Sequence, residues 1–286
     1  MGVSRRLVST KPDTAIKPEK SQVETNPADA TNPPPESVLS LDQIGQVFAK
    51  GSDRLVALEH VDLGIRPGEF VSLVGPSGCG KSTLLKIIAG LLQPTVGRVQ
   101  FEGSAVTEPR DEIGLMFQTP TLFPWRTTIR NITLPLEIRK ATEFDWEQRV
   151  AEVIDLVQLN GFENHYPREL SGGMQQRVAL SRLLVSDPHL MLLDEPFGAL
   201  DEFTREHLNT ELARISDHEG KTTVFVTHNI AEAVFLSDRV VVMGTRPGRI
   251  LEVVDVPIPR PRLPASRRSP TYNDTINRIR ETLDLS

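Results

Sequence analysis

The residues from Gly75 to Thr83 have the types and spacing of a phosphate-binding loop. They are Gly75, Pro76, Ser77, Gly78, Cys79, Gly80, Lys81, Ser82 and Thr83. Glycines let successive backbone N–H groups turn toward one anion, while Lys81 reaches the outer phosphates and Ser82 offers a hydroxyl to Mg²⁺. The apolar run 70–74 predicts a strand before the loop, and residues 82–92 predict a helix after it. Because this is the context that the motif needs, the segment predicts a site for ATP and Mg²⁺.

Two adjacent carboxylates, Asp194 and Glu195, end a second apolar run at residues 190–193. On their own they could be an exposed acidic pair that closes a strand. Beside a phosphate loop, the chemistry favours catalysis. Asp194 is placed to hold Mg²⁺ through its water shell, and Glu195 to accept a proton from the attacking water as the general base.

His228 and Gln118 each follow a predicted strand and complete the predicted catalytic group. His228 would contact the γ-phosphate and fix the attacking water. Gln118 can bind Mg²⁺ or water through its amide oxygen, and it lies where the chain enters a helical block. With Glu195 as the base, these residues predict ATP hydrolysis.

A second anion-binding turn occurs at residues 170–177, Leu-Ser-Gly-Gly-Met-Gln-Gln-Arg, which include Ser171, Gly172, Gly173 and Gln175. Ser171 is an N-cap hydroxyl at a helix start, where backbone N–H groups favour an anion. The first loop already occupies the phosphates of its own nucleotide, so this turn needs a phosphate held by a facing subunit. We expect Asp201 to cross the same interface. The pair of motifs therefore predicts a sandwich dimer.

Composition narrows the functional classes. The net charge of −6 gives no general electrostatic reason to bind nucleic acid. One cysteine excludes a disulfide framework, and the lack of an apolar run of eighteen residues means that any membrane role would come through a partner. Residues 1–37, rich in Pro, Thr, Ser and charge, are expected to form a disordered extension.

The pattern along the chain predicts an α/β fold with a P-loop NTPase (RecA-like) core. Apolar and polar residues alternate over 38–48 and 58–65, which indicates an antiparallel β subdomain. Helical periodicity over 127–184 indicates an inserted α-helical subdomain at about 119–186. Other strands are predicted at 98–101, 113–117, 223–226 and 239–243. The tail 257–286 is Pro- and Arg-rich, with a short helix near 273–283.

Taken in order, these motifs resemble the ATP-binding subunits of ABC transporters, from about Val38 to Val256. The resemblance implies an ABC ATPase domain over 38–256, in which Phe48 stacks on adenine. A core phenylalanine in an edge strand is the alternative for Phe48. The tail after Val256 is shorter than the regulatory β-domain of sugar-importer ATPases.

The segment Leu-Phe-Pro-Trp-Arg-Thr-Thr at 122–128 and Thr-Arg-Pro-Gly-Arg-Ile at 245–250 resemble the nitrate/sulfonate/taurine (also bicarbonate) importer subfamily. This implies two ATPase subunits, identical or paralogous, beneath two transmembrane permease subunits at the cytoplasmic face of the inner membrane. A solute-binding protein would deliver a small anion of the nitrate, sulfonate/taurine or bicarbonate type.

In such importers the segment 118–128 would line the groove for the permease, and packing within the helical block is the alternative. An exporter ATPase and a soluble, non-transport ABC ATPase remain as alternative functions. A small-molecule P-loop kinase would have no use for the motif at 170–177.

Overall fold

A computed structural model describes residues 1–2, 37–50, 53–140, 146–198 and 200–285. The chain divides into Met1–Ala30 and Thr31–Ser286, and the fold described below belongs to the second unit. Apart from residues 1, 2 and 37, the extension predicted at 1–37 lies outside the described residues.

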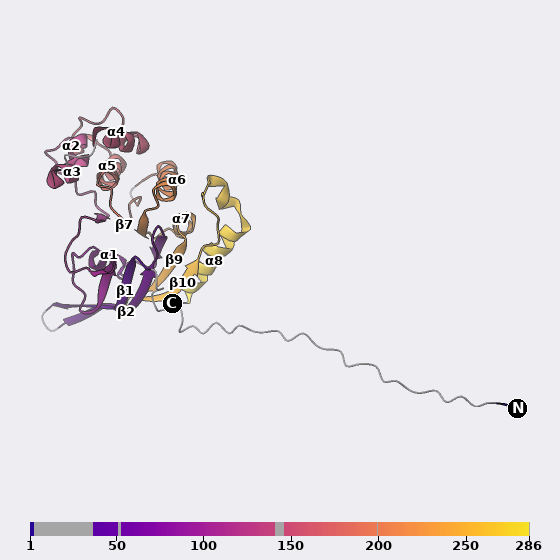
Figure 1. Ribbon diagram of the computed structural model, residues 1–286. Helices are drawn as coiled ribbons and strands as arrows, with labels where there is room; N and C mark the ends of the chain where they lie inside the picture. Colours follow the sequence, from indigo (N-terminus) through magenta and orange to yellow (C-terminus); the bar gives the residue numbers. More distant parts are fainter. Residues whose placement is uncertain (3–36, 51–52, 141–145, 199, 286) are drawn as a thin grey trace. The chain divides into compact units, whose positions relative to one another are not determined.

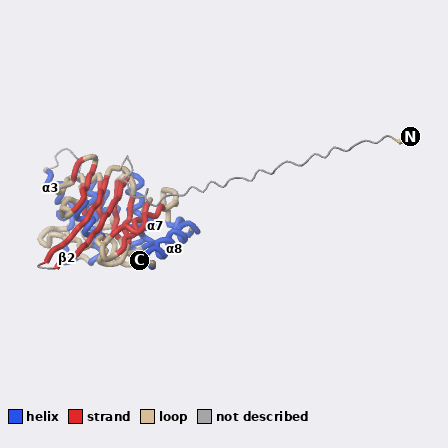
Figure 2. Tube along the Cα trace, turned by 90° about the horizontal axis from the view of Figure 1, so that it is seen from below, coloured by secondary structure: helices blue, strands red, loops and turns tan. Residues whose placement is uncertain are grey.

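The central sheet of this unit has six strands and lies among the helices (Figures 1 and 2). Its order is β10-β9-β3-β8-β7-β6, parallel except for the antiparallel pair of β9 and β10. Every residue of β3, β7 and β8 is buried, which explains the continuous apolar runs in the sequence. The strands are β3 (Phe70–Val74), β6 (Ile113–Met116), β7 (Leu190–Asp194), β8 (Thr222–Val226), β9 (Arg239–Gly244) and β10 (Arg249–Asp255).

A second sheet is antiparallel and has the order β2-β1-β4-β5. Its strands are β1 (Leu39–Lys50), β2 (Asp53–Ile65), β4 (Val96–Phe101) and β5 (Ser104–Ala105). Apolar side chains of this sheet, of helix α1 (Lys81–Ile88) and of the central sheet form one buried cluster. The phosphate-loop helix is therefore fixed by both sheets.

Helix α1 ends at Ile88, whereas the sequence predicted a helix to residue 92. Gly90 has φ +72°, and Leu91 N–H donates to Lys86 O at 2.9 Å. A left-handed glycine with such a bond ends a helix, although apolar residues continue beyond it.

The predicted helical insertion contains α2 (Thr128–Ile132), α3 (Leu134–Arg139), α4 (Trp146–Leu156), the 3₁₀ turn η2 (Pro167–Glu169) and α5 (Gly172–Val185). Helix α5 packs against α2, α3 and α4 and also reaches β6. Its buried side chains join the larger apolar cluster of the unit. The insertion is thus attached to the central sheet through α5.

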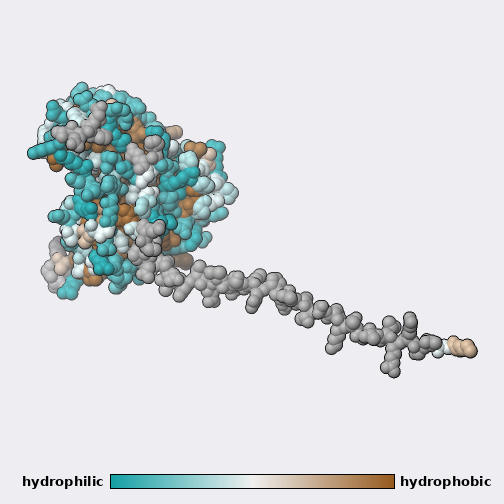
Figure 3. Space-filling view, in the orientation of Figure 1, coloured by the Kyte–Doolittle hydropathy of each residue, from teal (hydrophilic) through white to brown (hydrophobic). Residues whose placement is uncertain are grey.

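The remaining helices are α6 (Glu202–Glu219), α7 (Ile230–Leu236), η3 (Pro264–Arg268) and α8 (Pro270–Asp284). Helix α8 packs on α7 and β9, and it begins three residues before the predicted start at 273. The earlier start follows from Ser269, whose side chain caps the helix, and from Pro270 in its first turn. The visible face of the unit is largely hydrophilic (Figure 3). Within the described residues, every helix is too short or too polar to cross a bilayer.

Candidate functional site

A cavity of about 680 Å³ lies at the carboxyl ends of the parallel strands. Such an edge gathers residues that are distant in sequence, because neighbouring strands end there together. The cavity is lined by Phe48, Leu55, Val56, Ala57, Ser77, Gly78, Gly80, Lys81, Ser82, Thr83, Gln118, Glu195, His228, Arg246 and Gly248. Predicted site residues from separate segments of the chain therefore meet in one place.

Hydrogen bonds from Lys81 to backbone carbonyls, and close packing at Gly80, hold the phosphate loop in shape. Lys81 Nζ donates to Gly75 O at 2.7 Å and to Pro76 O at 3.0 Å, and the side chain lines the cavity. Gly80 has φ +94°, and a Cβ there would come within 3.0 Å of Ala57 O. The loop needs glycine at this position both for its backbone conformation and for its close approach to β2.

Gly248, in the turn between β9 and β10, supports the loop from the other side. Its N–H donates to Ala57 O at 3.1 Å, and a Cβ would overlap Cys79 O. In the same turn, Arg246 lines the cavity. Neither residue was predicted from the sequence, although both stand in the motif at 245–250 that carries part of the family resemblance.

Ser82 and Asp194 lie together behind the loop, where Ser82 Oγ donates to Asp194 Oδ1 at 3.0 Å. Asp194 is 7 % exposed, and this burial raises the pKa of its carboxyl, while the Ser82 hydrogen bond acts in the opposite direction. A hydroxyl and a carboxylate are the hard oxygen ligands that Mg²⁺ prefers. This pair fits the predicted metal site.

Two predicted catalytic residues, Gln118 and His228, meet at one carboxylate oxygen of the third, Glu195. Gln118 Nε2 donates to Glu195 Oε2 at 3.1 Å, and His228 Nδ1 lies 3.4 Å from the same oxygen. Glu195 has φ +47°, which is strained for a residue with a side chain. Its N–H donates to Val226 O at 2.9 Å. The backbone of Glu195 is thus tied to β8, and its side chain lines the cavity.

Ser171, Gly172, Gly173, Gln175 and Asp201 are absent from the described lining of this cavity. Ser171 Oγ accepts from Met174 N–H at 3.3 Å and caps α5 as predicted. Gln175 Nε2 donates to Pro167 O at 3.0 Å, so it fastens the helix start to η2. The residues of the second anion-binding turn form a separate surface, and their role toward a partner's nucleotide remains a prediction.

Asp201 caps α6 and is exposed. It accepts from Thr204 N–H at 3.0 Å and from Thr204 Oγ1 at 2.7 Å, and these hydrogen bonds lower the pKa of its carboxyl. A direct contact joins the two surfaces elsewhere, because Gln176 Nε2 of α5 donates to Gln118 O at 3.3 Å. Gln176 belongs to the motif at 170–177, but a local sequence pattern cannot predict a contact with a residue as distant in the chain as Gln118.

The structure shows where the predicted adenine contact, Phe48, and the aromatic residues of the segment 122–128 lie. Phe48 is 42 % exposed and lines the cavity, so it is no core residue. Trp125 is 70 % exposed, and its ring lies edge-on to that of Phe123 at 5.3 Å. Buried Asn131 fixes this segment, accepting from Phe123 N–H and donating to Phe123 O and Arg126 O. The segment held by these hydrogen bonds therefore presents Trp125 at the surface.

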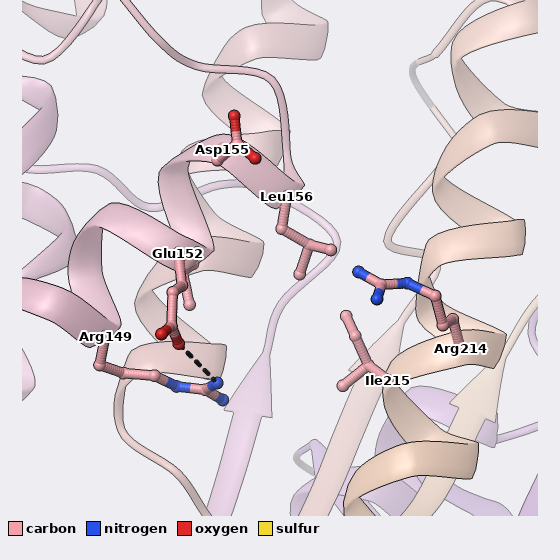
Figure 4. Close-up of a pocket in the computed structure, with 7 residues that line it drawn as sticks. Arg149, Glu152, Asp155, Leu156, Arg214 and Ile215 are labelled. Carbon is pink, nitrogen blue, oxygen red and sulfur yellow. Dashed lines mark ion pairs between the residues drawn. The ribbon is translucent and has the colours of Figure 1, made fainter.

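Another cavity, of about 350 Å³, lies between α4 and α6 (Figure 4). Arg149, Glu152, Arg214 and Ile215 are among its lining residues, with an ion pair between Arg149 and Glu152 at 4.0 Å. Its described lining includes none of the predicted site residues. The chemistry predicted from the sequence is thus concentrated in the cavity at the phosphate loop.

Comparison with known proteins agrees with this geometry. The family model described as ABC transporter matches residues 58–198. The aliphatic sulfonates import ATP-binding protein SsuB of one Bacillus cereus strain is 42 % identical over 241 residues, 84 % of this chain and 94 % of that protein. The chain belongs to the ABC transporter family of ATP-binding subunits. It has the P-loop NTPase fold and ATPase activity of that family, as the sequence predicted.

A curated protein and a solved structure are also similar to this ABC subunit. The nitrate import ATP-binding protein NrtC of Synechococcus elongatus is 48 % identical over 248 residues, 84 % of this chain and 37 % of that protein. A solved dimeric ATP-binding cassette, in a post-hydrolysis state with ADP and Pi, is similar with a TM-score of 0.70 and 35 % identity. The similarity covers 76 % of this chain and 98 % of that one. The predicted resemblance to the nitrate/sulfonate importer subfamily is confirmed.

Proposed function

We propose that this ABC subunit hydrolyses ATP to drive the import of a small anionic solute. Two of its relatives are named as import ATP-binding proteins for aliphatic sulfonates and for nitrate, which favours an importer over an exporter or a soluble ABC ATPase. The observation that carries the catalytic part is the meeting of Gln118 and His228 on one oxygen of Glu195, inside the cavity of the phosphate loop.

In the proposed reaction Lys81 binds the outer phosphates and Glu195 accepts a proton from the attacking water. His228 fixes the position of that water against the γ-phosphate. Ser82, Asp194 and Gln118 would hold Mg²⁺, which when bound with ATP neutralises phosphate charge. Phe48, at the rim of the same cavity, stacks on adenine.

A second ATPase subunit, either a copy or a paralogue, completes the site. Ser171, Gly172 and Gly173 form a helix start at the surface, and Asp201 begins an exposed helix turn. We assign both to the nucleotide of the facing subunit. Closure on ATP and reopening after hydrolysis then provide the motion that transport needs.

The exposed side chain of Trp125, on the support made by Asn131, is the proposed contact for one of two transmembrane permease subunits. Gln118 connects this segment to Glu195 in the cavity. The subunit would thereby lie at the cytoplasmic face of the inner membrane, and an extracytoplasmic solute-binding protein would deliver the anion to the permease.

Uptake by cells of the source organism tests this function. A strain lacking the gene receives the wild-type chain or Lys81→Ala, and uptake of labelled nitrate, taurine, an alkanesulfonate and bicarbonate is measured. We expect the wild-type chain, and not the variant, to restore uptake of one of these anions. Restoration of none of them, with a fully active ATPase in vitro, would contradict the proposed import of an anion.

A further inference from the structure

A buried polar network lies beneath His228. Its centre is Glu232, in the first turn of α7, which is 7 % exposed. Glu232 Oε2 accepts from Thr227 Oγ1 at 2.6 Å, and Oε1 accepts from Asn209 Nδ2 at 3.1 Å. Both donors are neutral, and both residues are buried. A carboxylate removed from water in this way depends strongly on these two hydrogen bonds.

The network holds the chain on both sides of His228. Thr227 Oγ1 accepts from Asn229 N–H at 3.0 Å, and Asn229 Oδ1 accepts from Glu232 N–H at 3.2 Å. The residues before and after His228 are therefore both tied to Glu232. The imidazole itself is 64 % exposed and has Glu195 as its neighbour at 3.4 Å. Its position is set by its backbone, which the network fixes.

The same network reaches α6 through Asn209. Asp201, assigned above to the subunit interface, is the N-cap of helix α6. Asn209 Oδ1 is buried without a hydrogen-bond partner among the described residues, so Asn209 is held in the network through its Nδ2 hydrogen bond to Glu232. The Asn209–Glu232 hydrogen bond thus joins α6 to the network that holds the turn carrying His228.

We propose that Glu232 is a positioning residue for ATP hydrolysis and that its hydrogen bond to Asn209 couples the placement of α6 to that of His228. The inference rests on the proposed role of His228 in the reaction. In this proposal the Asn209–Glu232 hydrogen bond does more than stabilise the fold. When α6 shifts at dimer closure, the Thr227–Asn229 turn moves with it, and the imidazole of His228 moves relative to Glu195.

The first test is Asn209→Asp, which replaces the donor by a second carboxylate within hydrogen-bond distance of Glu232. Two buried carboxylates repel each other, so the Glu232 side chain leaves its place under His228. We expect kcat for ATP to fall roughly tenfold or more, as for a small misplacement of a catalytic group. The KM for ATP and the Kd for a fluorescent ATP analogue should stay the same, because the phosphate loop is unchanged.

The decisive test is the reciprocal exchange Asn209→Asp/Glu232→Gln. The new glutamine can donate to the new carboxylate on α6 and accept from Thr227 Oγ1, so the pattern of donors and acceptors is restored with the charge moved to α6. We expect the double variant to recover most of the kcat that Asn209→Asp loses. A double variant that is as slow as Asn209→Asp, or slower, would overturn the coupling.

Controls separate positioning from stability. Tyr272 Oη donates to Ala231 O of the same helix α7 at 2.8 Å and makes no hydrogen bond to Glu232, Thr227 or Asn209, so Tyr272→Phe should lower Tm without lowering kcat. If Asn209→Asp lowers Tm while its folded fraction keeps the wild-type kcat, the pair is only structural and the inference fails. Should Asn209→Asp not fold, Asn209→Ala provides the same comparison without an added charge. His228→Ala must itself be slow, and a fast His228→Ala would instead refute the proposed role of His228.

Discussion

The two predicted phosphate-binding surfaces of this subunit differ in how many of their residues have partners within the chain. At the phosphate loop, Lys81, Ser82 and Glu195 each have hydrogen-bond or ionic partners within the chain, and together they line one cavity. At the start of α5, Ser171 and Gly172 are exposed, and a Cβ on Gly172 would meet no atom within 4 Å. The first surface is shaped by its own chain. The second has open space in front of it, as expected if a facing subunit supplies the nucleotide there.

The largest expected effect is on the first surface. Glu195→Gln removes the proposed base but keeps an amide that Gln118 and His228 can contact, so turnover should fall by about 10²–10⁴-fold while ATP still binds. Rapid-quench measurement of phosphate release checks the loss of turnover. Titration with a fluorescent ATP analogue checks that binding is retained. We expect the ATP-bound variant to elute as a dimer, and wild-type turnover would refute the assignment.

Alanine substitution of two glycines, one at each surface, should have an intermediate effect, on stability at one surface and on turnover at the other. Gly248→Ala pushes a methyl group into Cys79 O and should lower the free energy of unfolding by about 1–3 kcal/mol. Gly172→Ala meets open space and should change it by less than about 0.5 kcal/mol. Denaturant titration measures both. Turnover of Gly172→Ala should nevertheless drop, because in the proposed dimer its methyl group would face the partner's nucleotide, and unchanged turnover would contradict that placement.

The smallest effect concerns two aspartates whose pKa values move in opposite directions. Burial raises the pKa of Asp194, so its charged form destabilises the fold at neutral pH and the penalty disappears as pH falls below the usual aspartate range. Asp194→Asn should therefore raise Tm slightly at pH 7 in the absence of nucleotide. This difference should vanish in acid.

Asp201 is the matched case on the other surface. Hydrogen bonds from Thr204 lower the pKa of its carboxyl, so it contributes stability above the unfolded pKa and loses it as pH falls through the folded pKa. Asp201→Asn should lower Tm slightly at pH 7 and match the wild type in acid. Melting curves from acid to neutral pH compare both variants, and shifts of the same sign at pH 7 would contradict the assignment of burial to one residue and capping to the other.

Much of the fold could be predicted from the sequence because the decisive signals are local. Buried runs such as 70–74 and 190–193 indicate parallel strands, and the motifs follow them directly. The end of α1 was missed because Gly90 stops the helix while the apolar pattern continues. Strand β10 was not predicted, and its burial pattern is mostly intermediate, as expected of an edge strand.

The candidate site was predictable for residues that stand in a motif and unpredictable for those joined only by the fold. Gln118, Glu195 and His228 could be predicted to lie together because strand ends meet at one edge. Asn209 and Glu232 are 23 residues apart on two helices, and their hydrogen bond depends on how α6 and α7 pack. Periodicity contains no information about that packing.

The central claim is that each nucleotide is held by the phosphate loop of one subunit and the 171–173 turn of another. Its most direct test mixes two inactive variants, Lys81→Ala, which breaks the loop, and Ser171→Arg, which fills the turn. In a mixed dimer one composite site has both an intact loop and an intact turn, so ATPase activity should reappear on mixing although neither variant is active alone. Mixtures that remain as inactive as the separate variants, while forming mixed dimers, would contradict the claim.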